Sequence, residues 1–123
     1  MQPSILVVDD SALARTAAIQ RLRAQGVGVT ALASTQEAAC LDLSGFAAAL
    51  LDIDLGDGWG TDIAERLRQG APGIPVAFLT AQTPEALLDG ARRLGPVFSK
   101  NGGVEEAIAW IVEAARAVHP IGT

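Results

Sequence analysis

The sequence is short of the residues that mark secreted, disulfide-stabilised proteins. Its 123 residues include one cysteine, one histidine and no tyrosine, and aromatic residues make up only 4% of the chain. A single cysteine, Cys40, excludes an internal disulfide and favours a reducing compartment. Because the only histidine, His119, lies beside Pro120 near the end of the chain, we expect a solvated His119 and a buried, structural Cys40 rather than a catalytic pair.

Basic residues and long apolar runs are also scarce. Lysine and arginine total 9 against 14 aspartates and glutamates, for a net charge of −5, which disfavours direct binding to nucleic acid because such binding relies on basic surface. No apolar run approaches the ~20 residues of a membrane span. The N-terminal MQPSILVVDD lacks the basic region of a secretory signal. We therefore expect a soluble, cytoplasmic protein.

Length and composition predict one domain over residues 1–123. Domains commonly contain ~100–150 residues, and the chain has neither an internal repeat nor a Gly/Ser-rich linker. Hydrophobic residues make up 50% of the sequence. The expected core is therefore sizeable and consists mainly of Ala, Leu, Val and Ile.

Short apolar runs alternate with helix-patterned stretches along the whole chain. The predicted strands cover residues 5–8, 27–32, 47–51, 75–79 and 97–99. The predicted helices cover residues 12–25, 34–43, 61–68 and 83–94, and a last helix carries an apolar face of Val104, Ile108, Ile111, Ala115 and Val118. Ser34 with Glu37 predicts a capping box, and Thr83 followed by Pro84 predicts a helix start.

Continuous apolar strands that alternate with helices predict an α/β fold, with a parallel sheet covered by helices on both faces. In such sheets ligands bind outside the carboxyl ends of the strands. The residues that leave these ends are Asp9-Asp10, Asp52, Thr80 and Lys100. We expect all of them to meet at one edge of the sheet.

Phosphoryl transfer to an aspartate needs each of these residue types. Three carboxylates in one place repel each other unless a cation lies among them, and magnesium prefers a few carboxylates with water and phosphate oxygens. Asp52 could then attack a phosphoryl group as a nucleophile. Lys100 could neutralise a phosphoryl oxygen, and the Thr80 hydroxyl could donate a hydrogen bond to one.

Four short motifs resemble the receiver domain of bacterial two-component response regulators. They are VVDDS near the start, LLD in the third strand, LTA after the fourth and a lysine after the fifth. The resemblance covers the whole chain and implies a doubly wound, flavodoxin-like sheet of strand order 2-1-3-4-5. It also implies that Asp9 and Asp10 bind Mg²⁺ or Mn²⁺ and that Asp52, which itself contacts the metal, accepts phosphate from a histidine kinase or phosphotransfer protein.

The same resemblance assigns the remaining site residues and the partners. Thr80 and Lys100 hold the phosphoryl group, and Asp54 lends its backbone carbonyl to the metal. Such a domain phosphorylates and dephosphorylates itself without being a turnover enzyme. The chain has no room for a DNA-binding output domain, so it is either a stand-alone receiver or one excised from a larger protein. It is expected to dock a downstream protein through its fourth helix, fifth strand and fifth helix.

The sequence departs from the family at three places. Gly56 replaces the usual proline four residues after the phosphoacceptor, and Val97 replaces the aromatic switch residue. Strand alternation places Phe98 on the opposite side from Val97. Asn101 replaces the proline that usually forms a cis bond after the lysine, so we expect a trans Lys100–Asn101 bond. The loop from Thr80 to Pro84 could carry the switch instead.

Purely structural roles for these residues, and other functions for the protein, remain open. Asp9-Asp10 could cap the first helix, and Asp54 and Asp57 could be solvated loop residues.

Asp52-x-Asp54 also resembles the nucleophile motif of haloacid-dehalogenase-type phosphatases. In that family the motif follows the first strand, whereas here it follows the third. A calcium-binding EF-hand would need a glycine at Asp57 and a glutamate at Ile63. A phosphorylation-independent receiver fold that only binds proteins is a further alternative. The missing aromatic and proline favour it, whereas five intact site residues oppose it: Asp9, Asp10, Asp52, Thr80 and Lys100. Two tryptophans, Trp59 and Trp110, could be partner contacts or partly packed residues.

Overall fold

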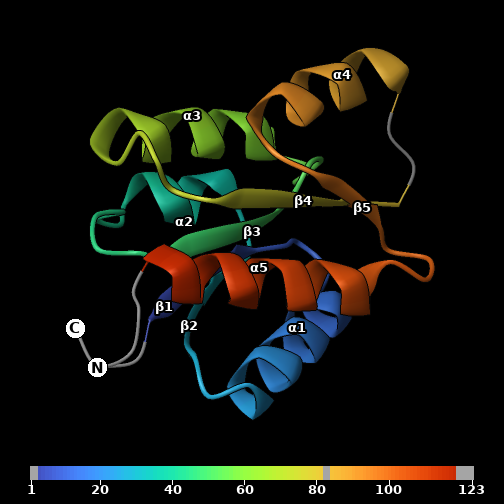
Figure 1. Ribbon diagram of the computed structural model, residues 1–123. Coiled ribbons are helices and arrows are strands. Elements are labelled where there is room, and N and C mark those ends of the chain that lie inside the picture. The colour runs from blue at the N-terminus through green and yellow to red at the C-terminus, as the bar shows by residue number, and fades with distance from the viewer. Residues whose placement is uncertain (1–2, 82–83, 119–123) are drawn as a thin grey trace.

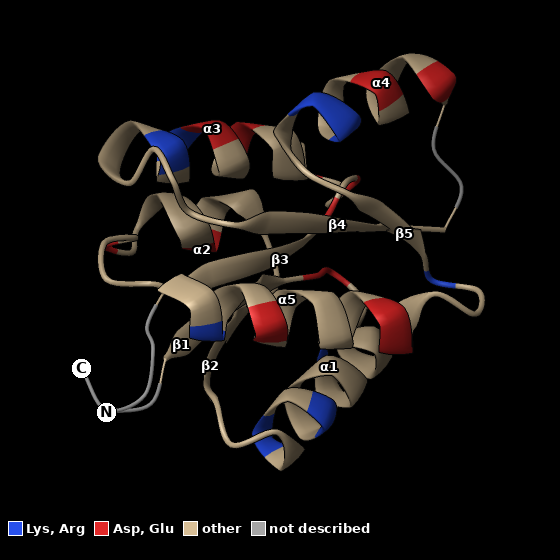
Figure 2. Ribbon diagram, in the orientation of Figure 1, with Lys and Arg blue, Asp and Glu red and all other residues tan. Residues whose placement is uncertain are grey.

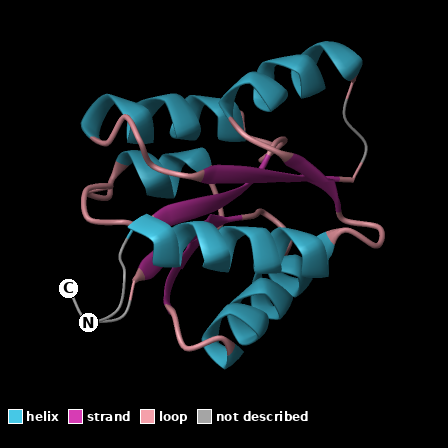
Figure 3. Cartoon of the chain, in the orientation of Figure 1, coloured by secondary structure: helices cyan, strands magenta, loops and turns pink. Residues whose placement is uncertain are grey.

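A parallel sheet forms the centre of the molecule, as predicted. The computed structural model describes residues 3–81 and 84–118, and its strands lie in the order β2-β1-β3-β4-β5. Figure 3 shows the strands running side by side between two layers of helices. The strands of the described chain are β1 (Ser4–Val8), β2 (Gly28–Leu32), β3 (Ala48–Asp52), β4 (Val76–Thr80) and β5 (Val97–Ser99). The fold is the flavodoxin-like, doubly wound α/β fold.

Helices cover both faces of this sheet. In Figure 1, α1 and α5 lie on one face, and α2, α3 and α4 lie on the other. The helices of the described chain are α1 (Ala12–Ala24), α2 (Thr35–Ala39), α3 (Gly60–Gly70), α4 (Glu85–Leu94) and α5 (Val104–Val118). Among these, every helix is too short or too polar to cross a lipid bilayer.

Strand alternation divides the core into two apolar clusters, one on each face of the sheet. Val7 and Leu50 pack with the α1 and α5 cluster, whereas Leu6 and Leu51 pack with the α2, α3 and α4 cluster. This arrangement explains why the central strands are apolar at nearly every position, since both of their faces are buried. β3 is buried along its whole length, including its last residue, Asp52.

The predicted capping box exists, but its helix is shorter than expected. The Ser34 hydroxyl accepts a hydrogen bond from the Glu37 amide (3.1 Å), and the Glu37 carboxylate accepts one from the Ala33 amide (2.9 Å). We expected the helix to continue to residue 43, but α2 ends at Ala39. Arg66 of α3 donates to two carbonyls at that end, so the side chain supplies the hydrogen bonds that a further turn would have made.

Two predictions about burial are wrong. Cys40 is exposed, because α2 ends at Ala39 and Ala38 is the helix residue that contacts the core. Val118 is 47% exposed; the buried face of α5 is made by Ala107, Ile108, Ile111, Val112 and Ala115. The predicted helix start at Thr83 and the solvated His119 lie outside the described residues.

Candidate functional site

Acidic side chains gather at the carboxyl ends of β1 and β3. Carboxylate oxygens of Asp9, Asp10 and Asp52 all lie within 4.8 Å of one another. Asp9 and Asp52 are only 3% and 6% exposed, while Asp10 faces solvent. Figure 2 shows the acidic segments after β1 and β3 on the same side of the molecule as the basic residue that follows β5. The sheet thus brings together residues more than forty positions apart in the chain.

Lys100 lies between the two buried carboxylates. Its ammonium nitrogen is 3.0 Å from the carboxylate oxygens of Asp9 and 3.0 Å from Oδ2 of Asp52. Burial lowers the pKa of Lys100, but hydrogen bonds and charge from Asp52 and Asp9 outweigh burial and raise it above its ordinary value. Lys100 therefore carries its charge at neutral pH and neutralises part of the acidic cluster.

Asp52 has an unusual affinity for protons in this setting. Burial raises its pKa from the ordinary 3.8 to about 7, the nearby Lys100 opposes this rise, and Asp9 and Asp10 add to it. A carboxylate resists ionising when it is buried beside other carboxylates. One lysine does not offset the whole negative charge of the cluster, so a further cation would favour the ionised form of Asp52.

The donor set fits a divalent cation of the magnesium type. Mg²⁺ binds oxygen ligands at about 2.0–2.1 Å, so two ligands of one ion lie at most about 4.2 Å apart. The carboxylates of Asp9, Asp10 and Asp52, within 4.8 Å of one another, need only a small adjustment to reach that spacing. With one ammonium group among three carboxylates, a divalent cation would bring the local charge close to balance.

The Asp54 side chain is not one of the three clustered carboxylates and bonds within its own loop. Its carboxylate accepts a hydrogen bond from the Gly56 amide of its own loop (3.0 Å), and the residue is exposed. Residues 53–60 form a small hairpin in which the Gly60 amide donates to the Ile53 carbonyl (2.8 Å) and the Leu55 amide donates to the Gly58 carbonyl (3.0 Å). Neither of these bonds uses the Asp54 carbonyl.

Backbone conformation explains why Gly56 stands where the family usually has proline. Gly56 has a φ of +82°, a value that proline cannot adopt because its ring fixes φ near −65°. A side-chain carbon at this position would lie 3.8 Å from Oδ2 of Asp10. The hairpin thus follows a different path from a proline-containing loop and passes close to the acidic cluster.

Asp57 has bonding partners that sequence reasoning missed. We expected a solvated loop residue; it is exposed, but its two carboxylate oxygens accept hydrogen bonds from the backbone amides of Thr35 and Gln36, both at 3.1 Å. These bonds, with that of Thr35 foremost, lower the pKa of Asp57. The partners lie 22 and 21 positions away in the chain, so no local sequence signal could have indicated the contact.

The remaining predicted residues lie at the ends of β4 and β5. Thr80 is half-buried at the end of β4, where its carbonyl accepts a hydrogen bond from the Lys100 amide (2.8 Å). Val97 and Phe98 pack against opposite clusters, as strand alternation predicted. The Lys100–Asn101 bond is trans, as expected, and the Asn101 amide donates to the Ser99 hydroxyl (3.0 Å).

Arg15 is a second contact that the sequence did not reveal. From the first turn of α1 its guanidinium donates to the backbone carbonyl of Asp9 (2.8 Å). Gln82 and Thr83, which belong to the loop proposed as an alternative switch, lie outside the described residues.

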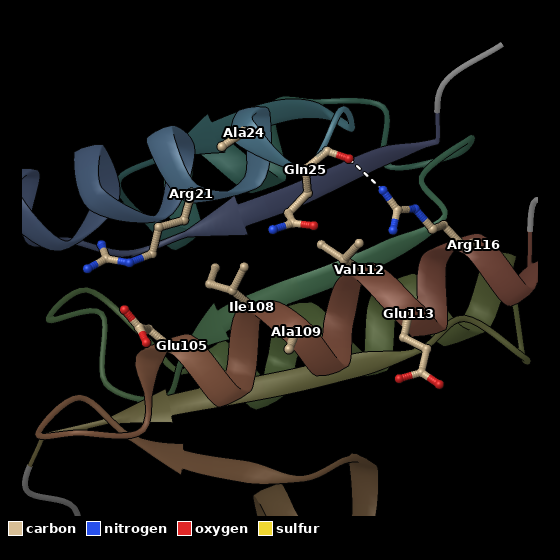
Figure 4. A pocket seen from close by; sticks show the side chains of 9 residues that line it. All are labelled: Arg21, Ala24, Gln25, Glu105, Ile108, Ala109, Val112, Glu113 and Arg116. Carbon is tan, nitrogen blue, oxygen red and sulfur yellow. Dashed lines mark hydrogen bonds between the residues drawn. The ribbon is translucent and has the colours of Figure 1, made fainter.

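A groove between two helices of the described chain lies away from the acidic cluster. It has a volume of about 640 Å³ and separates α1 from α5. In Figure 4, Ile108 and Val112 form its apolar floor, and Arg116 donates to the Gln25 carbonyl (2.5 Å) across one end. Since Ile108 and Val112 are themselves buried, the groove is a seam between two helices and offers little apolar surface.

Comparison with known proteins identifies the family. Residues 5–97 match the response regulator receiver domain. The chain belongs to this family. None of the curated proteins compared matches the sequence. Receiver domains are signalling modules of two-component systems, so the family assignment agrees with the motifs at the strand ends.

Solved receiver structures share the fold over nearly the full chain. A CheY-like receiver domain protein from Methanospirillum hungatei is 23% identical, with 96% of this chain and 97% of that chain covered and a TM-score of 0.82. A receiver protein from Sinorhizobium medicae is 19% identical (95% and 97% covered, TM-score 0.83). The non-phosphorylated HemR receiver domain from Leptospira biflexa is 28% identical (93% and 94% covered, TM-score 0.78).

Proposed function

We propose that this receiver domain accepts a phosphoryl group on Asp52 from a histidine kinase or a histidine phosphotransfer protein. The observation that carries the proposal is the position of Lys100, 3.0 Å from both Asp9 and Asp52 within a cluster of three carboxylates. A lysine and an acidic pair around a buried carboxylate supply the charges that phosphoryl transfer needs.

The transfer forms one bond and breaks one. An ionised oxygen of Asp52 attacks the phosphorus of a phosphohistidine, and the phosphorus–nitrogen bond breaks. The electron pair of that bond remains on the imidazole, which then takes up a proton. The product is an acyl phosphate on Asp52, with the Lys100 ammonium and the Thr80 hydroxyl as donors to phosphoryl oxygens. Attack requires the ionised form, so groups that lower the pKa of Asp52 favour the reaction.

Mg²⁺ or Mn²⁺ is the proposed cofactor. The residues that would hold it are the carboxylates of Asp9, Asp10 and Asp52 and the backbone carbonyl of Asp54. When bound, the ion stabilises negative charge on the phosphoryl oxygens. Asp9 is held in place for this role by the Ser11 amide, which donates to its carboxylate (2.9 Å), and by Arg15, which donates to its carbonyl.

The proposed output is docking of a downstream protein in the cytoplasm. In this family the docking surface is formed by α4, β5 and α5. In this chain α5 carries Trp110, which is 37% exposed as its position off the apolar face predicted. An amphipathic aromatic side chain of this kind suits a protein interface. Trp59, 38% exposed in the hairpin of residues 53–60, is a second candidate contact.

A small phosphodonor tests the proposal. Incubation of the protein with acetyl phosphate and Mg²⁺ should add the mass of one phosphoryl group, and Asp52→Ala should abolish the gain. Asp42→Ala, which removes an exposed carboxylate bonded only to its own loop, should leave the gain intact. No mass gain in the wild-type protein would contradict the proposal.

The alternative is a receiver fold that binds proteins without phosphorylation. Val97, at the usual aromatic switch position, packs half-buried against the α2, α3 and α4 cluster, which favours this alternative. Absence of phosphorylation together with full Mg²⁺-independent folding would support it.

A further inference from the structure

The hairpin of residues 53–60 lies between the acidic cluster and α2. On one side, a side-chain carbon at Gly56 would lie 3.8 Å from Asp10, and one at Gly60 would lie 2.1 Å from the Asp52 carbonyl. On the other side, a carbon at Gly58 would lie 2.8 Å from the Thr35 side chain. The hairpin is therefore in close contact with both neighbours, and a shift at its tip changes its distance from the acidic cluster.

Asp57 joins the tip of this hairpin to α2. Its carboxylate accepts one hydrogen bond from each of the Thr35 and Gln36 amides (3.1 Å each), and the Thr35 hydroxyl lies 3.5 Å from the Asp57 carbonyl. The next amide of α2, that of Glu37, bonds instead to the Ser34 hydroxyl (3.1 Å). Two of the amides that a helix start leaves without intrahelical partners are thus satisfied from a loop that is distant in sequence.

We propose that Asp57 is a positioning residue for the metal site: by bonding to α2 it fixes the hairpin that carries Asp54 and so sets the affinity for Mg²⁺ or Mn²⁺. The inference rests on the proposed function, because it assumes that the Asp54 carbonyl and the nearby carboxylates hold the ion. Groups that orient metal ligands without touching the metal commonly change its affinity when they are removed. Asp57 contacts neither Asp52 nor the other carboxylates and acts only through the hairpin.

Titration with Mn²⁺, followed by the electron paramagnetic resonance signal of the free ion, measures the affinity directly. Asp57→Ala should bind Mn²⁺ about tenfold more weakly than the wild-type protein. Asp57→Asn, which keeps one carbonyl acceptor, should fall between the two. Asp42→Ala removes an equal charge from another exposed loop aspartate and should change the affinity less than about twofold.

A substitution on α2 separates positioning from simple loss of charge. Thr35 is the first residue of α2, where proline fits a helix well because the amide has no intrahelical partner. Thr35→Pro therefore removes both Thr35 donors to Asp57, the amide and the hydroxyl, while it leaves the Asp57 charge and the helix in place. It should weaken Mn²⁺ binding by about as much as Asp57→Asn. Wild-type affinity in Thr35→Pro would mean that Asp57 acts through charge alone and would overturn the proposal.

Two further measurements control for weakening of α2 and for a variant that does not fold. Ser34→Ala weakens the start of α2 without touching Asp57, so it should lower thermal stability while leaving Mn²⁺ affinity unchanged; a matching loss of affinity would overturn the proposal. If Asp57→Ala does not fold, faster amide exchange at Gln36 in Asp57→Asn reports the loss of the contact instead, and unchanged exchange would count against it.

Failure of the inference can be told from failure of the proposed function. If the wild-type protein binds no Mn²⁺ and takes up no phosphoryl group, the proposed function fails. If the wild-type protein does both and the Asp57 and Thr35 variants bind Mn²⁺ equally well, the proposed function stands and only the role of Asp57 is overturned.

Discussion

At the scale of single residues, the balance between one ammonium and three carboxylates governs the site. Lys100 contacts Asp9 and Asp52 at 3.0 Å, and these two carboxylates are among the few buried charged groups of the described chain. Breaking a buried pair leaves an uncompensated charge behind. The lysine therefore stabilises the fold when no divalent cation is bound, and in the proposed function it also donates to the phosphoryl group.

The raised pKa of Asp52 predicts how stability depends on pH. The pKa is about 7 in the folded protein and has its ordinary value of 3.8 in the unfolded chain. Between these values the folded protein binds more protons, so its stability falls as the pH rises towards 7 and stays low above it. With Mg²⁺ chelated, the wild-type protein should therefore melt at a lower temperature at pH 8 than at pH 6.

Asp52→Asn tests this pH dependence, because it removes the ionisable group and keeps the shape. It should remove most of the difference between pH 6 and pH 8 and raise the melting temperature at pH 8 by about 3–6 °C. Asp42→Asn removes a carboxylate whose pKa is lowered rather than raised, so this variant should keep the wild-type dependence of stability on pH. An unchanged pH dependence in Asp52→Asn would show that another group is responsible. Thermal melts followed by circular dichroism measure all of these quantities.

At the scale of elements, close contact between the hairpin and β3 sets the start of α3. Gly60 is the first residue of α3, and a side-chain carbon there would lie 2.1 Å from the Asp52 carbonyl. No side chain fits at this distance without a shift of backbone. The glycine therefore holds the loop against the strand that carries Asp52.

A pair of glycine substitutions in helices tests this packing. Gly60→Ala should lower the free energy of unfolding by about 2–4 kcal/mol, as overpacked core positions do. Gly90→Ala is the matched control, because Gly90 lies inside α4 with nothing within 4 Å of the added carbon; it should raise stability by about 0.5–1 kcal/mol through its higher helix propensity. Equal effects in chemical denaturation would contradict the steric explanation.

At the scale of the whole molecule, the sheet links the acidic cluster to global stability. Asp9, Asp52 and Lys100 follow or end three different strands of one sheet. A ligand that binds only the folded state stabilises the entire domain. Metal binding at this edge is therefore expected to raise the melting temperature of the whole protein.

Mg²⁺ should accordingly stabilise the protein in a concentration-dependent way. At a concentration of one hundred times its dissociation constant, the gain is about 2.7 kcal/mol. Chelation with EDTA should reverse the gain, and Asp10→Asn should reduce it. Asp62→Asn, an exposed aspartate of α3, should keep it. If NaCl of equal ionic strength stabilises the protein as much as Mg²⁺ does, ordinary screening explains the effect and the metal site does not.

Much of the fold could be predicted from the sequence because its signals are local or periodic. Strands buried on both faces require continuous apolar runs, and parallel strands place their carboxyl ends at one edge. These rules predict the layered fold and place Asp9, Asp10, Asp52 and Lys100 together at one edge of the sheet. The boundaries of α2 and the exposure of Cys40 were wrong, because a distant arginine, Arg66, ends that helix.

The sequence by itself determined which residue types stand at the end of each strand, and hence the family and the candidate chemistry. Only the tertiary structure decided the position of Lys100 between two carboxylates, the path of the hairpin at Gly56 and the bonds from Asp57 to α2. The physical reason is the distance along the chain between the residues in contact. Apolar periodicity and capping act between near neighbours in the chain, whereas the bonds of Lys100 and Asp57 join segments 21 to 91 residues apart and exist only once the sheet has formed.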